Sequence, residues 1–171
     1  MEIKVIDIPV EGLKVNLKPN PSEIEGLGED ITVLAINRAE FDLKKVGATV
    51  YIAGATDIVV ELPCSRCGKR FHSKAASSFS LDMNPLERLG EEEEKGLSPD
   101  DLNVEFYRGG VIELMELLRQ QILLLAPMKP LCSEDCRGLC QYCGQDKNER
   151  ECGCEPPAGH PGLAGLKDLL K

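Results

Sequence analysis

The sequence predicts an α+β protein in which an antiparallel sheet, or a partly closed β-barrel, packs against one main helix. Between residues 3 and 83, short β-branched segments follow one another with no long helical segment between them. This order is typical of antiparallel sheets. After residue 110, one Leu-rich segment without Gly or Pro has the periodicity of a helix. A cysteine-rich segment then follows, and its composition differs from that of the rest of the chain.

The predicted strands are short apolar segments that end at turn residues. They span residues 3–8, 13–17, 31–36, 38–43, 49–53, 57–62 and 71–83. Residues 38–43 either continue the strand before them or form the next one. The residues between these two segments, 49–53 and 57–62, include Gly54, so we expect a hairpin turn there. In the last segment Phe71, Ala75, Phe79, Leu81 and Met83 alternate with polar residues, which indicates a strand with one apolar face.

The segment that follows these strands is predicted to be a loop. Residues 84–101 contain two prolines and an acidic block at residues 91–94, a composition that disfavours packed structure. Residues 103–107 indicate a short strand, and Gly109 and Gly110 indicate a turn.

The main helix is predicted over residues 111–126, and Pro127 ends it. Leu114, Leu117, Leu118 and Ile122 recur at helical spacing, so we expect them to face the sheet. Residues 122–126 are all apolar, which predicts that this end of the helix is deeply buried. We therefore expect a β-rich domain over residues 1–126 and a cysteine-rich, metal-binding segment over residues 127–171. We expect the second segment to end in a short helix with Leu163, Leu166, Leu169 and Leu170 on one stripe.

The cysteine-rich segment is too poor in apolar residues to order itself by burial. It contains six of the eight cysteines, namely Cys132, Cys136, Cys140, Cys143, Cys152 and Cys154. A C-x-x-C pair followed by Gly144 is typical of a zinc knuckle, in which two thiolates bind one ion and the glycine permits a sharp turn. We therefore expect zinc. Because tetrahedral zinc takes four ligands, the six candidates imply either a subset or a second or bridged site. A disulfide framework and redox-active thiols are the alternatives.

Cys64 and Cys67 form another C-x-x-C pair, and Gly68 follows it. They are a second candidate metal or thiol pair. The sequence leaves open whether they complete a site with the C-terminal cysteines, bind a metal alone or stay free in a hairpin. A redox pair fits less well, because a strand and not a helix is predicted to follow it.

Charge is distributed unevenly along the chain. The net charge is −9 and Trp is absent, which disfavours a general nucleic-acid binder that relies on long-range attraction and base stacking. Residues 62–81, however, contain no acid. The candidate RNA contacts in this stretch are Arg66, Lys69, Arg70 and Lys74.

No signal peptide or membrane-spanning segment is apparent in the sequence. We therefore expect a cytoplasmic, reducing location with no membrane partner. In such a compartment, clustered cysteines are more often metal ligands than disulfides.

Several motifs in this order resemble one bacterial family. They are LPCSRCGKRF, then LLLAPMKPLCSEDCRGLCQYCG, then a C-x-C pair, and finally GLAGLKDLL. The chain resembles the large ribosomal RNA subunit accumulation protein family, the YceD family. The resemblance implies a role in the synthesis, processing or accumulation of large-subunit ribosomal RNA, without enzymatic activity. It also places the six C-terminal cysteines on the cysteine pattern of the zinc-bearing members.

Three functional hypotheses follow. The first is a non-enzymatic factor in ribosome biogenesis whose partner is ribosomal RNA, a pre-ribosomal particle, or ribosomal and assembly proteins, with no small-molecule substrate. The second is a zinc-bearing protein–protein adaptor without RNA contact. The third and weakest is a thiol enzyme, since no Ser–His–Asp set, paired catalytic carboxylates or phosphate-binding glycine loop is apparent.

Overall fold

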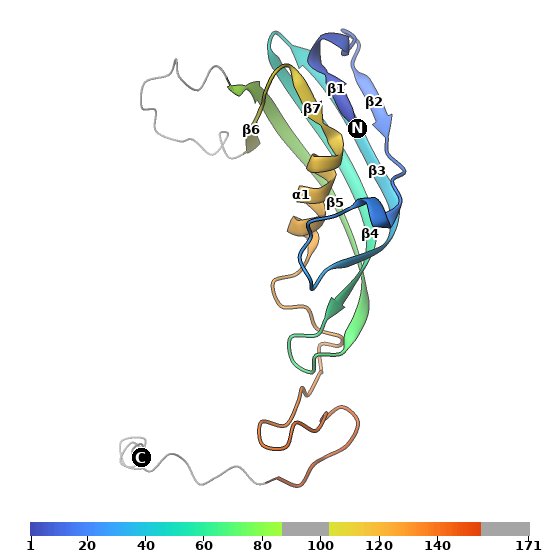
Figure 1. Cartoon of the computed structure of the whole chain (residues 1–171), viewed down its shortest axis with the longest axis vertical. Helices are drawn as coiled ribbons and strands as arrows, with labels where there is room; N and C mark the ends of the chain where they lie inside the picture. The colour runs from blue at the N-terminus through green and yellow to red at the C-terminus, as the bar shows by residue number, and fades with distance from the viewer. Residues whose placement is uncertain (87–102, 155–171) are drawn as a thin grey trace, which may run out of the picture.

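In a computed structural model, described for residues 1–86 and 103–154, the chain forms a long curved sheet with one helix on its concave face (Figure 1). The larger sheet contains β2 (Leu13–Asn16), β3 (Thr32–Val46), β4 (Thr49–Pro63), β5 (Arg70–Pro85) and β6 (Val104–Tyr107), in that spatial order. The smaller sheet pairs β1 (Glu2–Lys4) with β7 (Val111–Glu113), which leads directly into α1 (Leu114–Leu125). Two short 3₁₀ helices, η1 (Val5–Asp7) and η2 (Pro21–Glu23), complete the described elements.

The fold class is α+β, as the sequence predicted, but the sheet is not a barrel. Its outer strands are β2 and β6, and these two do not pair with each other. All neighbouring strands are antiparallel except β5 and β6, which are parallel. The expectation of a partly closed barrel is therefore wrong. The structure also differs from a single antiparallel sheet in two ways. The first strand pairs with β7, and β6 runs parallel to its neighbour.

Two long strands form the centre of the sheet. β3 and β4 each run for 15 residues, so the predicted segments 31–36 and 38–43 belong to one strand. Register shifts between Val33 and Ala35 and between Ile36 and Arg38 mark irregularities in it. Such bulges bend a strand without ending it.

The turn expected at Gly54 is also wrong, because Gly54 lies inside β4. A Cβ atom at this position would lie 2.3 Å from Cζ of Phe79 on the neighbouring strand. The ring of Phe79 also packs edge-on against that of Phe41, with centroids 5.9 Å apart. A glycine within a strand here permits close packing and does not signal a reversal.

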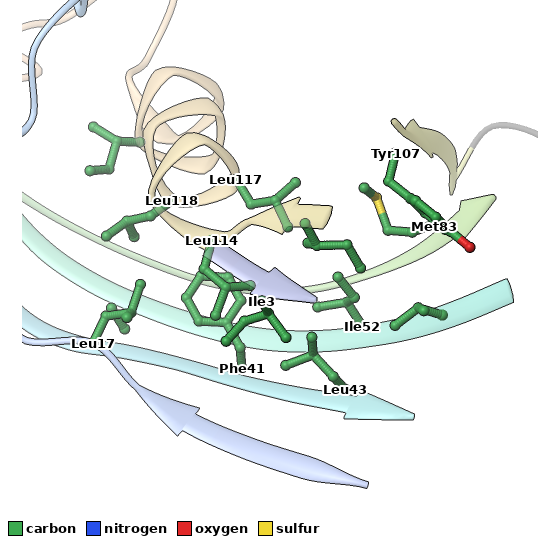
Figure 2. Close-up of a cluster of buried hydrophobic side chains, with 14 of the residues drawn as sticks. Ile3, Leu17, Phe41, Leu43, Ile52, Met83, Tyr107, Leu114, Leu117 and Leu118 are labelled. Atoms are coloured by element: carbon green, nitrogen blue, oxygen red, sulfur yellow. The ribbon is translucent and has the colours of Figure 1, made fainter. Parts of the chain in front are cut away.

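The core lies between α1 and the concave face of the sheet (Figure 2). Leu114, Leu117, Leu118 and Ile122 are buried, which confirms the predicted helix face. They belong to the same apolar cluster as Phe41 and other residues of β3 and β4.

The ends of the helix differ from the prediction. Residues 111–113 form β7, and the helix starts at Leu114. The expected deep burial of residues 122–126 is wrong, since Leu123 is 36% exposed and Leu124 is 78% exposed. Apolar composition alone cannot give a short helix a second buried face, because only one side contacts the sheet.

Smaller differences concern the chain's other segments. The first strand, predicted over residues 3–8, ends at Lys4, and η1 begins at Val5. The strand at residues 104–107 and the turn at Gly109 and Gly110 are confirmed. The acidic block and the C-terminal helix with Leu163, Leu166, Leu169 and Leu170 lie outside the described residues.

Candidate metal centres

All eight cysteines gather into two groups of four. The proximal cluster, named for its contact with the sheet, contains Cys64, Cys67, Cys132 and Cys136. The distal cluster contains Cys140, Cys143, Cys152 and Cys154. Within each cluster the four sulfur atoms lie within 4.8 Å of one another. Either cluster could therefore hold one metal ion.

The proximal cluster joins two segments that are far apart in the sequence. Cys64 and Cys67 lie in the turn between β4 and β5, which is closed by the hydrogen bond from Gly68 N to Cys64 O at 2.9 Å. The segment after α1 lies beside this turn: Ser65 N donates to Pro130 O at 2.8 Å, and Leu139 N donates to Arg66 O at 3.2 Å. These backbone contacts bring Cys132 and Cys136 to the turn.

The sulfur–sulfur distances in the proximal cluster test whether a metal fits. Cys64 Sγ lies 3.7 Å from Cys136 Sγ, and Cys67 Sγ lies 3.7 Å from Cys132 Sγ. A disulfide would require about 2.05 Å. Four sulfurs around a zinc ion, each about 2.3 Å from it, lie about 3.8 Å apart when the coordination is tetrahedral. The spacing therefore matches a tetrahedral tetrathiolate site.

The environment of Cys64 favours its thiolate form. Burial of this side chain by itself raises the thiol pKa, but backbone hydrogen bonds from Cys132, Arg66 and Cys67 outweigh that effect and lower the pKa to about 6. Burial raises the pKa of Cys132 to about 12, with further contributions from Cys136, Cys64 and Cys67. Four thiolates this close repel one another unless a cation neutralises them.

The distal cluster starts with a knuckle of the same kind. Gly144 N donates to Cys140 O at 2.9 Å, and Gly144 has a φ of +72°, a conformation that other residues rarely adopt. Cys140 N donates to Gln145 O at 2.8 Å as the chain turns back toward Cys152 and Cys154. Backbone hydrogen bonds from Cys143 and Tyr142 lower the pKa of Cys140 to about 6. Hydrogen bonds with Cys143 and Cys152 raise the pKa of Cys154 to about 12.

The donor set limits what these clusters can do chemically. Each consists of four cysteines and includes no His, Asp or Glu among the described residues. Cysteine-only sets of four are typical of structural zinc sites, whereas catalytic sites keep a position open for water or substrate. The arrangement is suited to cross-linking chain segments.

The sequence left two questions about the cysteines open, and the structure bears on both. The six C-terminal cysteines do not gather in one place, because Cys132 and Cys136 lie apart from the four that follow. Cys64 and Cys67 complete that separate group. The C-x-x-C-G pattern recurs at residues 64–68 and 140–144, which belong to different clusters, and Cys132 and Cys136 do not follow it, so it could not show which pairs meet. The assignment of individual cysteines as ligands stays a prediction.

The proximal cluster also crosses the boundary predicted after residue 126. Cys64 and Cys67 come from the region assigned to the β-rich domain, and their partners come from the cysteine-rich segment. The division into two domains stays a prediction.

Three of the four basic residues predicted to contact RNA have partners within the chain. Arg66 Nη1 donates to the carbonyl oxygens of Cys136, at 2.8 Å, and Glu134. Lys69 Nζ donates to Glu149 Oε1 at 2.7 Å. Arg70 Nε donates to Glu61 Oε2 at 2.6 Å. These bonds explain the local run of basic residues without RNA.

Lys74 differs from the other three. Its side chain is exposed and forms no hydrogen bond or ion pair with another residue of the described ranges 1–86 and 103–154. The contact of all four residues with RNA stays a prediction, and of the four only Lys74 has no partner in the described part of the chain.

Two acids and one amide near this turn carried no signal in the sequence. Asp146 and Glu149 both form ion pairs with Lys69, at 3.3 and 2.7 Å. Glu149 and Asp146 raise the pKa of Lys69. The side chain of Asn148 donates to Cys136 of the proximal cluster. A separation of 80 residues in the sequence hides the pair of Lys69 and Glu149.

Comparison with known proteins identifies the chain's relatives. Residues 52–170 match the family described as large ribosomal RNA subunit accumulation protein YceD. The chain belongs to this family. The match extends from β4 through both cysteine clusters to residue 170.

One curated relative supports this assignment. The protein named large ribosomal RNA subunit accumulation protein YCED homolog 1, chloroplastic, from Arabidopsis thaliana, is 25% identical over 150 residues. The alignment covers 69% of this chain and 44% of the relative, so the chain spans under half the length of that protein. No solved structure matches the chain. Within the described residues, no helix has the length and apolar character needed to cross a bilayer.

Proposed function

We propose that the chain is a non-enzymatic factor in the accumulation of large-subunit ribosomal RNA, acting during its synthesis, processing or assembly into ribosomes. The observation that carries this proposal is the family match over residues 52–170. The cysteine-only donor sets support a non-enzymatic role, because four thiolates saturate a tetrahedral ion. The proposal includes a reducing, cytoplasmic location, where the eight free thiols stay available for metal.

The proposal assigns zinc to both clusters. Tetrathiolate sets of this spacing suit a tetrahedral d¹⁰ ion with no redox chemistry. Zinc at the proximal cluster would link the β4–β5 turn to the segment after α1, and zinc at the distal cluster would close the last hairpin. The expected metal content is two zinc ions per chain.

For the RNA contact, Lys74 is the residue that the charge distribution favours. Charge reversal at Lys69 and Arg70 would break their pairs with Glu149 and Glu61 as well as any RNA contact. Lys74→Glu tests the RNA contact alone. Lys44→Glu is a matched control, since Lys44 is also exposed and has no hydrogen bond or ion pair among the described residues.

The experiment is a pull-down of the tagged chain from cells, with sequencing of the RNA that co-purifies and ribosome profiles of a deletion strain. We expect precursors of the large subunit to co-purify. Lys74→Glu should weaken this association at low salt and less so at high salt, since phosphate contacts release counterions. Lys44→Glu should leave it unchanged. Unchanged ribosomal RNA on deletion, with capture of non-ribosomal proteins only, would exclude the proposal.

A second candidate is a zinc-bearing adaptor that contacts protein and not RNA. Two observations favour it. The internal pairing of Arg66, Lys69 and Arg70 removes most of the predicted RNA surface. Leu124 and Met128, 78% and 101% exposed, present apolar surface near the end of α1. In the same pull-down, RNase-resistant capture of a protein partner, with no dependence on Lys74, would favour the adaptor.

A further inference from the structure

The loop of the distal cluster contacts the proximal cluster. Residues 144–151 connect Cys143 to Cys152, so this loop belongs to the distal cluster by sequence. Its Asn148 nevertheless donates from Nδ2 to Cys136 Sγ, a sulfur of the proximal cluster, at 3.4 Å. A side-chain N–H group in the loop of the distal cluster thus donates a hydrogen bond to a sulfur of the proximal cluster.

The hydrogen bonds around Asn148 fix the orientation of its amide. Arg137 N donates to Asn148 Oδ1 at 2.7 Å, so the oxygen faces the backbone and the nitrogen faces the sulfur. Asp146 Oδ1 accepts from Asn148 N at 2.8 Å and from Asn148 Nδ2 at 2.7 Å. A flipped amide would lose all the contacts of its oxygen and nitrogen.

Further contacts hold the same loop against the β4–β5 turn. Lys69, which follows the turn, contacts both Asp146 and Glu149. Lys147 N donates to Gly138 O at 2.9 Å, and the adjacent Leu139 N donates to Arg66 O. The loop is therefore positioned at both clusters at once.

We propose that Asn148 couples the two tetrathiolate sites. A metal at the distal cluster holds the loop closed, the closed loop keeps the Asn148 donor on Cys136, and the donor strengthens metal binding at the proximal cluster. Donors to metal-bound thiolates stabilise the sulfur's negative charge and fix its orientation. Asn148 is a positioning residue and not a ligand. This inference rests on the proposed binding of two zinc ions.

The test uses the full chain loaded with zinc, titrated with a competing chelator. The backbone amide signals of Gly68 and Gly144 in NMR spectra report the proximal and distal sites separately. We expect Asn148→Ala to lower zinc affinity at the proximal site about 10- to 100-fold, the range found for partners of metal ligands. Lys147→Ala is the control, because it keeps the backbone bond of the same loop. It should change neither site.

Combined variants show whether the two clusters lose zinc affinity together, through coupling, or independently. Emptying the distal cluster with Cys140→Ser and Cys143→Ser should weaken the proximal site by a similar factor, and adding Asn148→Ala should weaken it no further. Coupling is reciprocal, so emptying the proximal cluster with Cys67→Ser should weaken the distal site by the same factor. Additive losses, or an unchanged proximal site in Asn148→Ala, would overturn the inference.

A spectroscopic measurement distinguishes a lost donor from a merely loosened loop. With cobalt(II) in place of zinc, removal of the N–H donor raises the energy of the Cys136 sulfur electrons, so the sulfur-to-cobalt charge-transfer band should move to lower energy in Asn148→Ala and not in Lys147→Ala. An unmoved band would contradict the role of Asn148. Failure of the wild-type chain to bind zinc would overturn the proposed zinc sites and the coupling together, whereas two zinc ions that bind independently would overturn the coupling alone. The pull-down and the deletion strain test the proposed ribosomal RNA role separately.

Discussion

Two regions of this molecule are ordered by different physical means. The sheet–helix body (residues 1–63, 70–86 and 103–126) has a continuous apolar core that includes Phe41, Ile52, Leu114 and Leu118. The cysteine unit (residues 64–69 and 127–154) has a small buried cluster of Cys64, Cys67 and Cys136, against which Phe71 and Leu131 pack, and Cys140 is buried outside it. Burial of apolar side chains can stabilise the body. The cysteine unit needs a cross-link, since its apolar surface cannot offset the entropy of ordering its chain.

Removal of the metal should have the largest effect, because it should disorder the cysteine unit and leave the sheet–helix body folded. Structural zinc sites contribute roughly 10–16 kcal/mol of apparent binding free energy. We expect chelation to collapse the NMR signals of Cys140, Cys143 and Gly144, and also those of Cys64 and Cys67 in the β4–β5 turn. Signals of β5 residues 71–83 should persist, and zinc should restore the others.

The same experiment can contradict the metal assignment. If the protein is metal-free under reducing conditions and residues 132–154 still give dispersed signals, packing alone must order the cysteine unit. Cys140→Ser should resemble chelation at the distal cluster.

A charge placed in the apolar core should have the next largest effect. This effect should fall on the stability of the sheet–helix body. Leu118 is fully buried in contact with the sheet's core cluster. Leu118→Asp should lower the free energy of unfolding by several kcal/mol, because the carboxylate would be buried without a partner. Denaturant unfolding followed by circular dichroism measures the change.

Leu124→Asp is the matched control for that substitution. Leu124 lies on the same helix but is 78% exposed, so its change should stay within about 0.5 kcal/mol. Equal effects of the two substitutions would mean that α1 does not pack as described.

Adding a single methyl group to the cysteine unit, by a Gly-to-Ala substitution, should have the smallest of these effects. Gly138 has a φ of +69°, and a Cβ there would lie 2.9 Å from the backbone oxygen of Arg66. Gly138→Ala should therefore weaken zinc binding at the proximal cluster by roughly 1–3 kcal/mol, through strain and a clash with the turn. Chelator competition measures this loss, and the melting temperature of the body should not change.

Gly144→Ala separates the two causes. Gly144 has a similar φ of +72°, but nothing lies within 4 Å of its added Cβ. Gly144→Ala should weaken zinc binding at the distal cluster by less than Gly138→Ala weakens it at the proximal cluster, because only backbone strain opposes it. The difference between the two losses then measures the effect of the clash. A smaller loss for Gly138→Ala than for Gly144→Ala would contradict the contact between residue 138 and the turn.

The sequence was most informative where a pattern repeats within a few residues. The alternation in residues 71–83 predicted β5 and its apolar face, and the spacing of Leu114, Leu117, Leu118 and Ile122 predicted the buried side of α1. Both patterns report which side of one element meets water. Patterns with two meanings gave errors. Gly54 fits a turn or a close contact, and only the position of Phe79 shows which applies.

The sequence by itself determined that this chain has a β-rich body, one packing helix and cysteines in knuckle pairs, because local periodicity and spacing are enough for each. Only the tertiary structure decided that Cys64 and Cys67 join Cys132 and Cys136, that Lys69 is neutralised by Asp146 and Glu149, and that Asn148 contacts Cys136. Sulfurs and charges interact over a few ångströms in space. The path of the chain from α1 back to the β4–β5 turn sets those distances, and no local pattern in the sequence encodes that path.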